Sequence, residues 1–260
     1  MRCEIDRVLL NETLSNILTV LPSRTPSPDA TVDVKLVVKE HRLLLLATDG
    51  ETFLEIRLPL EQAAEDGIAI VNARKLAELV NALETESVSF YTEGNNLRMD
   101  TRKTRTVLLC AAPADFPQLK ELPEGTHFEF PLSTLHELYE ACGFAVAKDE
   151  LRQALTGINW EINNNETRMV STDGSRLAFA ARRGSYPCKL RAILPPKLFA
   201  LLPRAGETIS ISADPTHLSF RTDNTFIFCP QIAGPYPDYE RVLPKRYPAR
   251  AVLVRDEFIA

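Results

Sequence analysis

The sequence predicts an α+β fold built from two tandem copies of one unit, each with two helices packed on antiparallel sheets. The phrase Thr-Asp-Gly occurs at 48–50 and again at 172–174, both times between two apolar runs. Asp-Gly in that setting predicts a tight strand reversal, because glycine accepts the positive φ that the turn needs. Each half of the chain also reads as strand, helix, several strands, helix, several strands. A turn that recurs with its surroundings indicates a domain that recurs.

Other phrases recur in the same order and at nearly the same spacing, between 120 and 125 residues. These are "VNARKLAELVNAL" (71–83) with "LPPKLFALLPRA" (194–205), "ADFPQL" (114–119) with "GPYPDY" (234–239), and "EIDRVLLNETL" (4–14) with "EFPLSTLHELY" (129–139). Ordered matches at one spacing are typical of an internal duplication.

Helices are predicted wherever apolar residues recur with a spacing of three and four. Four stretches have this pattern, two in each copy, and the last has two prolines suited to a first helical turn. The apolar faces are Leu10, Leu14, Ile17, Leu18 and Leu21; Leu76, Leu79, Val80 and Leu83; Leu135, Leu138, Tyr139 and Cys142; and Leu198, Leu201 and Leu202 after Pro195 and Pro196. About seven or eight short β-rich runs per copy predict the strands on which these faces lie.

The duplication predicts two domains, 1–122 and 126–244, followed by the beginning of a third copy at 245–260. Val254 falls at the repeat position of Ile5 and Phe130. The third copy would stop just as its first helix starts, and a helix of a few residues has little stability of its own. We therefore expect residue 260 to be an artificial or accidental end and 245–260 to be weakly anchored.

Composition is that of a globular protein: 45% hydrophobic and 25% charged residues, with a net charge of −5. The N-terminus lacks the apolar core of a signal peptide, and no apolar run approaches the roughly 18 residues of a membrane span. The five cysteines are dispersed and lie in apolar stretches. We expect reduced thiols, a cytoplasmic location and no contact with a membrane.

No pattern in the sequence indicates an enzyme. The four histidines are dispersed, with no metal-ligand spacing, and phosphate-binding or dinucleotide-binding glycine motifs are absent. Asp49 and Asp173 occupy the same turn of the two copies, which favours a turn-forming role over paired-carboxylate chemistry. We expect no catalytic residues, no metal and no cofactor.

Two longer phrases carry a family resemblance: "STDGSRLAFAAR" (171–182) and "GPYPDYERVLP" (234–244), supported by "ADFPQL" and "VNARKL". Over essentially the whole chain the sequence resembles the bacterial sliding clamp, the beta subunit of DNA polymerase III. The resemblance implies the DNA-clamp fold and a processivity factor for DNA replication. In that family three copies form a subunit, and two subunits join head to tail into a ring around duplex DNA.

The resemblance also implies a shallow pocket in the second copy that binds a short peptide from polymerases and other clients. Its residues here would be Leu155, Thr172, Gly174, Ser175, Arg176, Leu177 and Pro244. Leucines and a proline suit apolar peptide anchors, and backbone and hydroxyl groups suit orientation. Ser175 stands where the family has histidine, and "TPSPDA" (25–30) is less apolar than usual. The third domain, which supplies the other half of the pocket, is mostly missing.

A protein that slides on DNA must contact phosphates, not bases. In the family the helices line the hole, so their outward faces should carry positive charge. The residues expected to face DNA are Arg24, Arg74, Lys75, Lys148, Arg152, Lys197 and Arg204. Glu137 and Glu140 do not fit this pattern.

The resemblance implies as partners sequence-independent duplex DNA, the catalytic subunit of DNA polymerase III, the clamp loader and other client proteins. It implies self-association into a ring if the third domain were present. The strand near 103–110 would then be an open apolar edge, giving a monomer or a dimer unlike that of the family, and no closed six-domain dimer. Alternatives are a two-domain clamp that trimerises, a clamp-like protein that binds only peptides, and, most distantly, an enzyme of unknown type.

Overall fold

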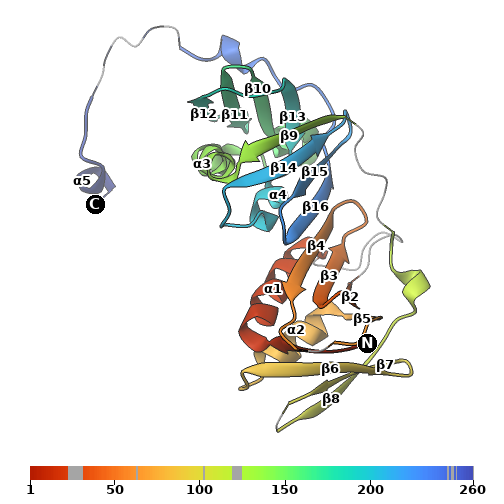
Figure 1. Cartoon of the computed structure of the whole chain (residues 1–260). Coiled ribbons are helices and arrows are strands. Elements are labelled where there is room, and N and C mark those ends of the chain that lie inside the picture. The colour runs from red at the N-terminus through yellow and green to blue at the C-terminus, as the bar shows by residue number, and fades with distance from the viewer. Residues whose placement is uncertain are drawn as a thin grey trace.

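The computed structural model describes residues 1–22, 32–62, 64–101, 103–118, 125–244, 246, 249 and 251–259. The elements of the first copy are β1 (Arg2–Asp6), α1 (Arg7–Val20), β2 (Asp33–Lys39), β3 (Arg42–Thr48), β4 (Phe53–Pro59), β5 (Gly67–Asn72), α2 (Ala73–Asn81), β6 (Ser87–Glu93), β7 (Asn96–Asp100) and β8 (Arg105–Leu109). The second copy repeats this order (Figure 1). Its elements are β9 (Thr126–Pro131), α3 (Leu132–Cys142), β10 (Ile158–Asn163), β11 (Glu166–Thr172), β12 (Leu177–Arg183), β13 (Leu190–Leu194), α4 (Pro196–Leu201), β14 (Thr208–Ala213), β15 (His217–Arg221) and β16 (Thr225–Pro230).

The described strands form three antiparallel sheets, and one of them joins the two copies. One sheet, of order β1-β6-β7-β8, lies wholly in the first copy, and another, of order β12-β11-β10-β13, lies wholly in the second. Between them an eight-stranded sheet runs β5-β2-β3-β4-β16-β15-β14-β9, so β4 of the first copy pairs with β16 of the second. Strands from two domains thus share one continuous ladder, and β8 and β12 are among the strands at the sheet edges.

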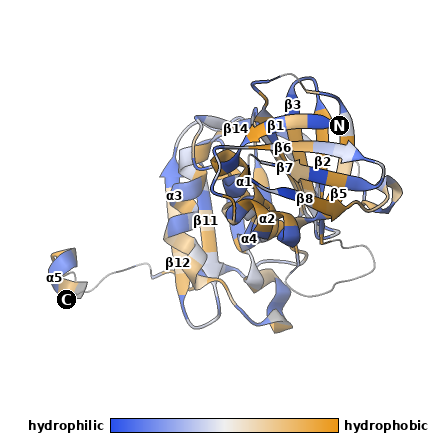
Figure 2. Ribbon diagram, turned by 90° about the horizontal axis from the view of Figure 1, so that it is seen from below, coloured by the Kyte–Doolittle hydropathy of each residue, from blue (hydrophilic) through white to orange (hydrophobic). Residues whose placement is uncertain are grey.

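The helices form where the sequence predicts them and bury most residues of the predicted faces, while Leu79, Leu83 and Tyr139 are half-buried. Asp6 caps α1 by accepting a hydrogen bond from the Leu9 amide at 2.8 Å, and Asn72 caps α2 through the Lys75 amide at 3.1 Å. Pro196 opens α4 at its first position. The leucines and Ile17 of the α1 stripe are buried, except for partly exposed Leu18. Helix α1 contacts both α2 and α4, and all three overlap in the view from below (Figure 2).

The joint between the copies is held by aromatic packing and one ion pair. Phe53, Phe226 and Phe228 form a separate buried cluster over β4 and β16, with the rings of Phe53 and Phe228 edge to face at 6.4 Å. Lys197 at the start of α4 reaches into the first copy, where its Nζ lies 2.7 Å from Asp49 Oδ2 and also donates to the Val20 carbonyl. These contacts make the two domains one packed body.

The two Thr-Asp-Gly phrases form the same turn, as predicted. In each, the Oδ1 atom of the aspartate accepts hydrogen bonds from two backbone amides just after the glycine, those of Glu51 and Thr52 or of Ser175 and Arg176. Gly50 and Gly174 have φ of 97° and 93°, a region that favours glycine. The turns connect β3 to β4 and β11 to β12.

The C-terminal segment lies away from the body of the molecule (Figures 1 and 2). Its described part contains one short helix, α5 (Arg255–Ile259), preceded by residues that are not in a strand. The side chains of Val252, Leu253, Val254 and Phe258 are exposed. The residues at the matching repeat positions, Ile5 in β1 and Phe130 in β9, are buried.

Candidate peptide-binding pocket and DNA-facing helices

Six of the seven residues predicted for a peptide pocket line one cavity of about 340 Å³. The turn after β11 and the start of β12 contribute Thr172, Gly174, Ser175, Arg176 and Leu177, and the 3-10 turn Glu150–Thr156 contributes Leu155. Leu155 is buried, whereas Leu177 is half-buried and faces the cavity. The cavity therefore has an apolar floor at the edge strand of a sheet.

The turn fixes the polar rim of this cavity. Asp173 holds Arg176 through an Nε–Oδ2 contact of 3.0 Å, and the two backbone amides on its other oxygen are the main cause of its lowered pKa. Arg176 also donates to the Phe144 carbonyl at 3.0 Å and lies over the Phe144 ring. The arginine is thus held in place before any ligand arrives.

The remaining wall comes from a segment whose role in the pocket the sequence analysis did not assign. Pro237, Asp238, Tyr239 and Val242 line the cavity, whereas the predicted Pro244 is exposed and is not among the lining residues. The Tyr239 hydroxyl donates to Glu161 Oε2 at 2.9 Å, which ties this segment to β10. The aromatic "GPYPDY" phrase was the available signal.

Exposed apolar side chains lie on the same segments that line the cavity. Phe144, Leu151, Phe179 and Val242 are all exposed large hydrophobic residues, and they come from the 3-10 turns, from β12 and from the Tyr239 segment. Single exposed apolar residues are ordinary on a protein surface, but several around one hollow indicate a site for an apolar partner. The cavity is suited to binding, because its polar groups Asp173 and Arg176 are engaged in holding the turn.

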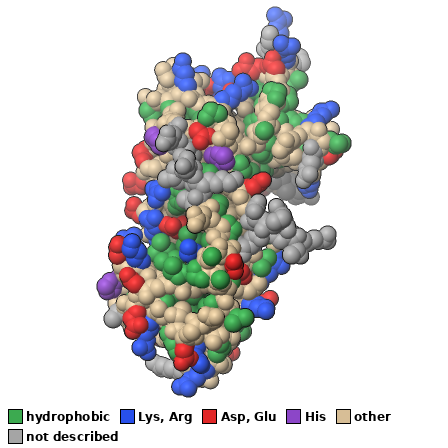
Figure 3. Space-filling model, turned by 90° about the vertical axis from the view of Figure 1, so that its right-hand side faces the viewer, with side chains coloured by type: hydrophobic (Ala, Val, Ile, Leu, Met, Phe, Trp, Pro, Cys, Tyr) green, Lys and Arg blue, Asp and Glu red, His purple; other side chains and the backbone are tan. Residues whose placement is uncertain are grey.

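The residues predicted to face DNA fall into three groups. Arg74, Lys75, Lys148, Arg152 and Arg204 are exposed, and Arg74 donates to the Pro22 carbonyl at 2.8 Å. Arg152 also lines the peptide cavity. Arg24 lies outside the described residues. On the sheet side shown in Figure 3, acidic and basic side chains are interspersed.

Lys197 forms the third group, because the structure gives it a different position. Its ammonium is engaged by Asp49 and by the Val20 carbonyl at the joint between the copies, and its side chain is only 34% exposed. Lys197 therefore ties the two copies together, and its contact with DNA stays a prediction. Glu137, which does not fit a DNA-facing surface, pairs with Arg182.

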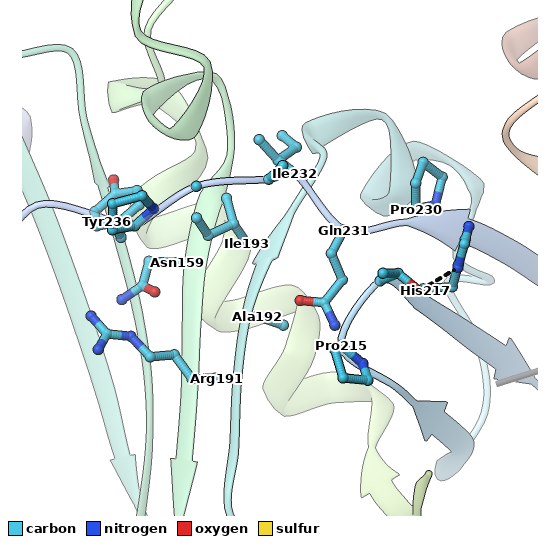
Figure 4. A pocket seen from close by; sticks show the side chains of 14 residues that line it. Asn159, Arg191, Ala192, Ile193, Pro215, His217, Pro230, Gln231, Ile232 and Tyr236 are labelled. Atoms are coloured by element: carbon cyan, nitrogen blue, oxygen red, sulfur yellow. Dashed lines mark hydrogen bonds between the residues drawn. The ribbon is translucent and has the colours of Figure 1, made fainter. Parts of the chain in front are cut away.

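A larger cavity, of about 540 Å³, is lined in part by the chain segment 230–236 and by none of the predicted site residues. Figure 4 shows the amides of Asn159 and Gln231 on opposite sides of it. Asn159 Nδ2 donates to Glu161, while no described residue donates to the buried Asn159 Oδ1. His217 at its rim stacks on Phe228, so this cavity adjoins the joint.

Among the described residues, no cluster of three or more histidine, cysteine, aspartate or glutamate side chains is placed to hold a metal ion. A search of the same residues for a helix long and apolar enough to cross a membrane finds none.

Comparison with protein families gives two matches that together follow the duplication. Residues 1–120 match the family model of the DNA polymerase III beta subunit, N-terminal domain, and residues 129–238 match that of its central domain. The beta sliding clamp of Pseudomonas aeruginosa is 32% identical over 252 residues, which cover 94% of this chain and 68% of that protein. The Escherichia coli beta sliding clamp is 28% identical with the same coverage.

The chain belongs to the beta sliding clamp family of DNA polymerase III. It is a DNA sliding clamp, with two copies of the clamp fold, and not an enzyme.

Solved beta sliding clamps have the same fold. A Pseudomonas aeruginosa clamp bound to griselimycin superposes with a TM-score of 0.88 at 31% identity, covering 95% of this chain and 68% of that one. A Helicobacter pylori beta clamp bound to a DNA ligase peptide gives 0.85 at 20% identity, covering 95% and 71%. The second likeness is one of fold alone.

The cysteines of this sliding clamp are all free, and burial separates one of them from the rest. Cys3, Cys142, Cys188 and Cys229 are buried, and Cys110 is half-buried at the end of β8. Burial raises the pKa of Cys3 and Cys142 to about 11 and that of Cys229 to about 12.

We expect iodoacetamide at pH 8 to label Cys110 first in the native protein, because it is the only thiol that is not buried. Burial raises the pKa of Cys110 too, so access of the reagent decides the order. Peptide mass spectrometry after short exposures gives the order of labelling, and the denatured chain serves as the fully reactive control. Labelling of Cys229 as early as Cys110 would contradict this burial pattern.

Proposed function

We propose that this clamp tethers client proteins through the pocket at Leu155 and Leu177 while its helices face duplex DNA. The observation that carries the peptide site is the convergence of six predicted residues on one cavity with an apolar floor. Pockets of this kind bind short segments through a few apolar anchors and a fixed polar rim. The clients we propose are the polymerase catalytic subunit, the clamp loader and other proteins with a clamp-binding motif.

The peptide site is tested by a labelled copy of the DNA ligase peptide, the class of ligand named for the Helicobacter pylori clamp. Amide shifts on titration should centre on residues 172–177 and on Tyr239. Shifts centred on the first domain would reject the assignment.

For DNA, the proposal rests on Arg74 and Lys75 on α2 and on Arg204 just after α4, all exposed. Helix α1 contacts both α2 and α4, so these cations lie on or beside helices that share α1 as a neighbour. Phosphate contacts from such a layer are independent of sequence and permit sliding. Lys197 serves the joint in this proposal, and DNA contact is left to its neighbours.

We expect Lys75→Glu with Arg204→Glu to weaken binding to a labelled duplex and to flatten its salt dependence. Each lost phosphate contact lowers the slope of log affinity against log salt by about 0.9, so the double change removes about 2. The control is Lys39→Glu with Lys189→Glu, which makes the same charge change at exposed sites next to strands. Equal losses in both pairs, or binding that ignores salt, would refute a helix-facing duplex.

The domain limits 1–122, 126–244 and 245–260 are part of the same proposal, as is action on DNA in the cytoplasm. The family matches at 1–120 and 129–238 support the first two limits.

A further inference from the structure

The cavity of about 540 Å³ beside β13 contains a buried polar group that has no partner in the described part of the chain. Asn159 is 0% exposed, and its Nδ2 donates to Glu161 Oε1 at 2.9 Å, which fixes the orientation of the amide. The Oδ1 atom on the other side of the amide receives no hydrogen bond from any described residue. An unpaired buried carbonyl costs free energy, and a ligand that donates a hydrogen bond recovers it.

Gln231 presents a second carbonyl oxygen from the opposite side of this cavity. Its Nε2 donates to the Asp214 carbonyl at 2.5 Å, so its Oε1 is left as an acceptor. Figure 4 shows the oxygen atoms of the Asn159 and Gln231 amides on the sides that face each other. Two facing acceptors favour a ligand that ends in a hydrogen-bond donor.

The internal duplication indicates which donor fits. Asn159 on β10 lies opposite Ile193 of β13, and Lys35 on β2 lies opposite Ile70 of β5 in the same way. Strands β10 and β2 occupy the same place in the two copies, as do β13 and β5. Asn159 therefore stands where the first copy has a lysine.

The first copy fills this position with its own ammonium group. Lys35 Nζ lies over the Phe116 ring, 5.6 Å from its centroid. Tyr236 has the place of Phe116 in the repeated phrase and is buried. An asparagine side chain is two atoms shorter than a lysine side chain, so the second copy keeps the aromatic ring and lacks the ammonium.

We propose that the cavity binds the side chain of a lysine carried by a partner polypeptide, with its ammonium placed as Lys35 Nζ is in the first copy. The ammonium donates to Asn159 Oδ1 and to Gln231 Oε1, and the face of the Tyr236 ring adds a cation–π contact. The methylene stem of the lysine packs on the apolar lining of the cavity. That lining includes Ala192, Ile193, Pro215, Pro230, Ile232 and Pro235.

This site is separate from the peptide pocket at Leu155 and Leu177, because the two cavities share no described lining residue. A partner bound there would contact the second domain at a further point. A lysine side chain fits better than a free diamine, because the second ammonium of a diamine would be left beside the guanidinium of Arg191, which also lines the cavity.

Arg191 gives the proposal a test of sign. Its side chain is 62% exposed, and its Nε lies 3.4 Å from Glu161 Oε1. Removing this cation takes away a repulsion on a bound ammonium and leaves the Glu161 carboxylate without its guanidinium. Arg191→Met should therefore strengthen binding of an ammonium, whereas it would weaken binding of an anion.

Amide-detected nuclear magnetic resonance of the whole chain tests the site with Nα-acetyl-lysine N-methylamide. Shifts should centre on residues 159, 191–193 and 231–236, with a Kd of about 1 mM for a ligand of this size. Nα-acetyl-norleucine N-methylamide has the same four-carbon stem without the ammonium and should bind at least about tenfold more weakly, since it cannot donate to the two carbonyls. Equal affinity for the two ligands, or shifts centred elsewhere, would overturn the proposal.

Variants provide the second measurement. Arg191→Met should bind the lysine ligand several-fold more tightly and the norleucine ligand unchanged, while Arg183→Met, at another exposed arginine, should change neither. Gln231→Leu should weaken the lysine ligand about tenfold, because one acceptor is lost.

Asn159→Lys places the residue of the first copy in the second and should abolish binding of the lysine ligand. Circular dichroism checks the fold of each variant, and the arginine and glutamine variants keep the test decisive if Asn159→Lys does not fold. Weaker binding of the lysine ligand in Arg191→Met would overturn the proposal. Putrescine that binds as tightly as the lysine ligand would overturn the polypeptide as the source of the ammonium.

Discussion

Replacing Phe228 by alanine is expected to lower the free energy of unfolding by about 3–5 kcal/mol, the range for a fully buried phenylalanine. The Phe228 ring is 0% exposed, packs on Phe53 across the joint and stacks on His217 at 4.9 Å. Its removal leaves a void between two domains that share a β-ladder. The loss should therefore appear in stability and in the coupling of the domains.

Two probes separate these effects in urea unfolding. Trp160, the single tryptophan, is buried in the second domain, so its fluorescence follows that domain, while far-ultraviolet circular dichroism follows both. The two transitions should coincide in the parent and diverge in Phe228→Ala. Phe179→Ala removes the same atoms from an exposed position on β12 and serves as the control. A loss below about 1 kcal/mol at Phe228 would mean that the ring contributes little to the joint.

Leu177→Ala is expected to weaken binding of the DNA ligase peptide by about 1–3 kcal/mol, a factor of roughly 5 to 150 in Kd. Leu177 is the half-buried apolar residue at the start of β12, and its truncation removes apolar area from the cavity without touching the turn bonds made by Asp173. Fluorescence anisotropy of the labelled peptide measures the change. Leu253→Ala is the control, since this leucine is exposed in the C-terminal segment.

The opposite change at the rim should strengthen binding. Ser175 is exposed, and only its backbone amide is used by Asp173, so Ser175→His keeps the turn and adds a flat polar side chain beside the cavity. A gain of affinity in Ser175→His together with a loss in Leu177→Ala would assign the site. Unchanged affinity in both variants would place the peptide elsewhere.

Local patterns predicted the parts of the fold that depend on neighbours in sequence. The helices, their buried faces and the Thr-Asp-Gly hairpins follow from periodicity and turn chemistry, and the structure confirms them. The union of β4 with β16 was not foreseen, because strand pairing between domains leaves no mark in a local pattern. The contacts that Lys197 makes across the joint are invisible to a local pattern for the same reason. Its partners lie 148 and 177 residues away.

The pocket was foreseen in part because one turn carries most of it. Five of its residues lie in a single stretch, 172–177, whereas Pro237, Tyr239 and Val242 reach it only through tertiary folding. Pro244 was assigned by resemblance and lies beyond the last lining residue. Pocket residues that come from a segment distant in sequence are the hardest to predict, because no local pattern links them to the turn.

The aspartates of the two Thr-Asp-Gly turns have one contact in common and one that differs. In both, one carboxylate oxygen is committed to the backbone amides that keep the loop in shape, so neither copy can change it without losing the turn. The other carboxylate oxygen, Oδ2, makes no contact with the turn backbone and can bind a side chain elsewhere. Oδ2 of Asp49 accepts a hydrogen bond from Lys197 of the neighbouring domain. Oδ2 of Asp173 accepts one from Arg176 at the pocket rim. The same residue type at the same turn position thus joins two domains in the first copy and orients a pocket residue in the second.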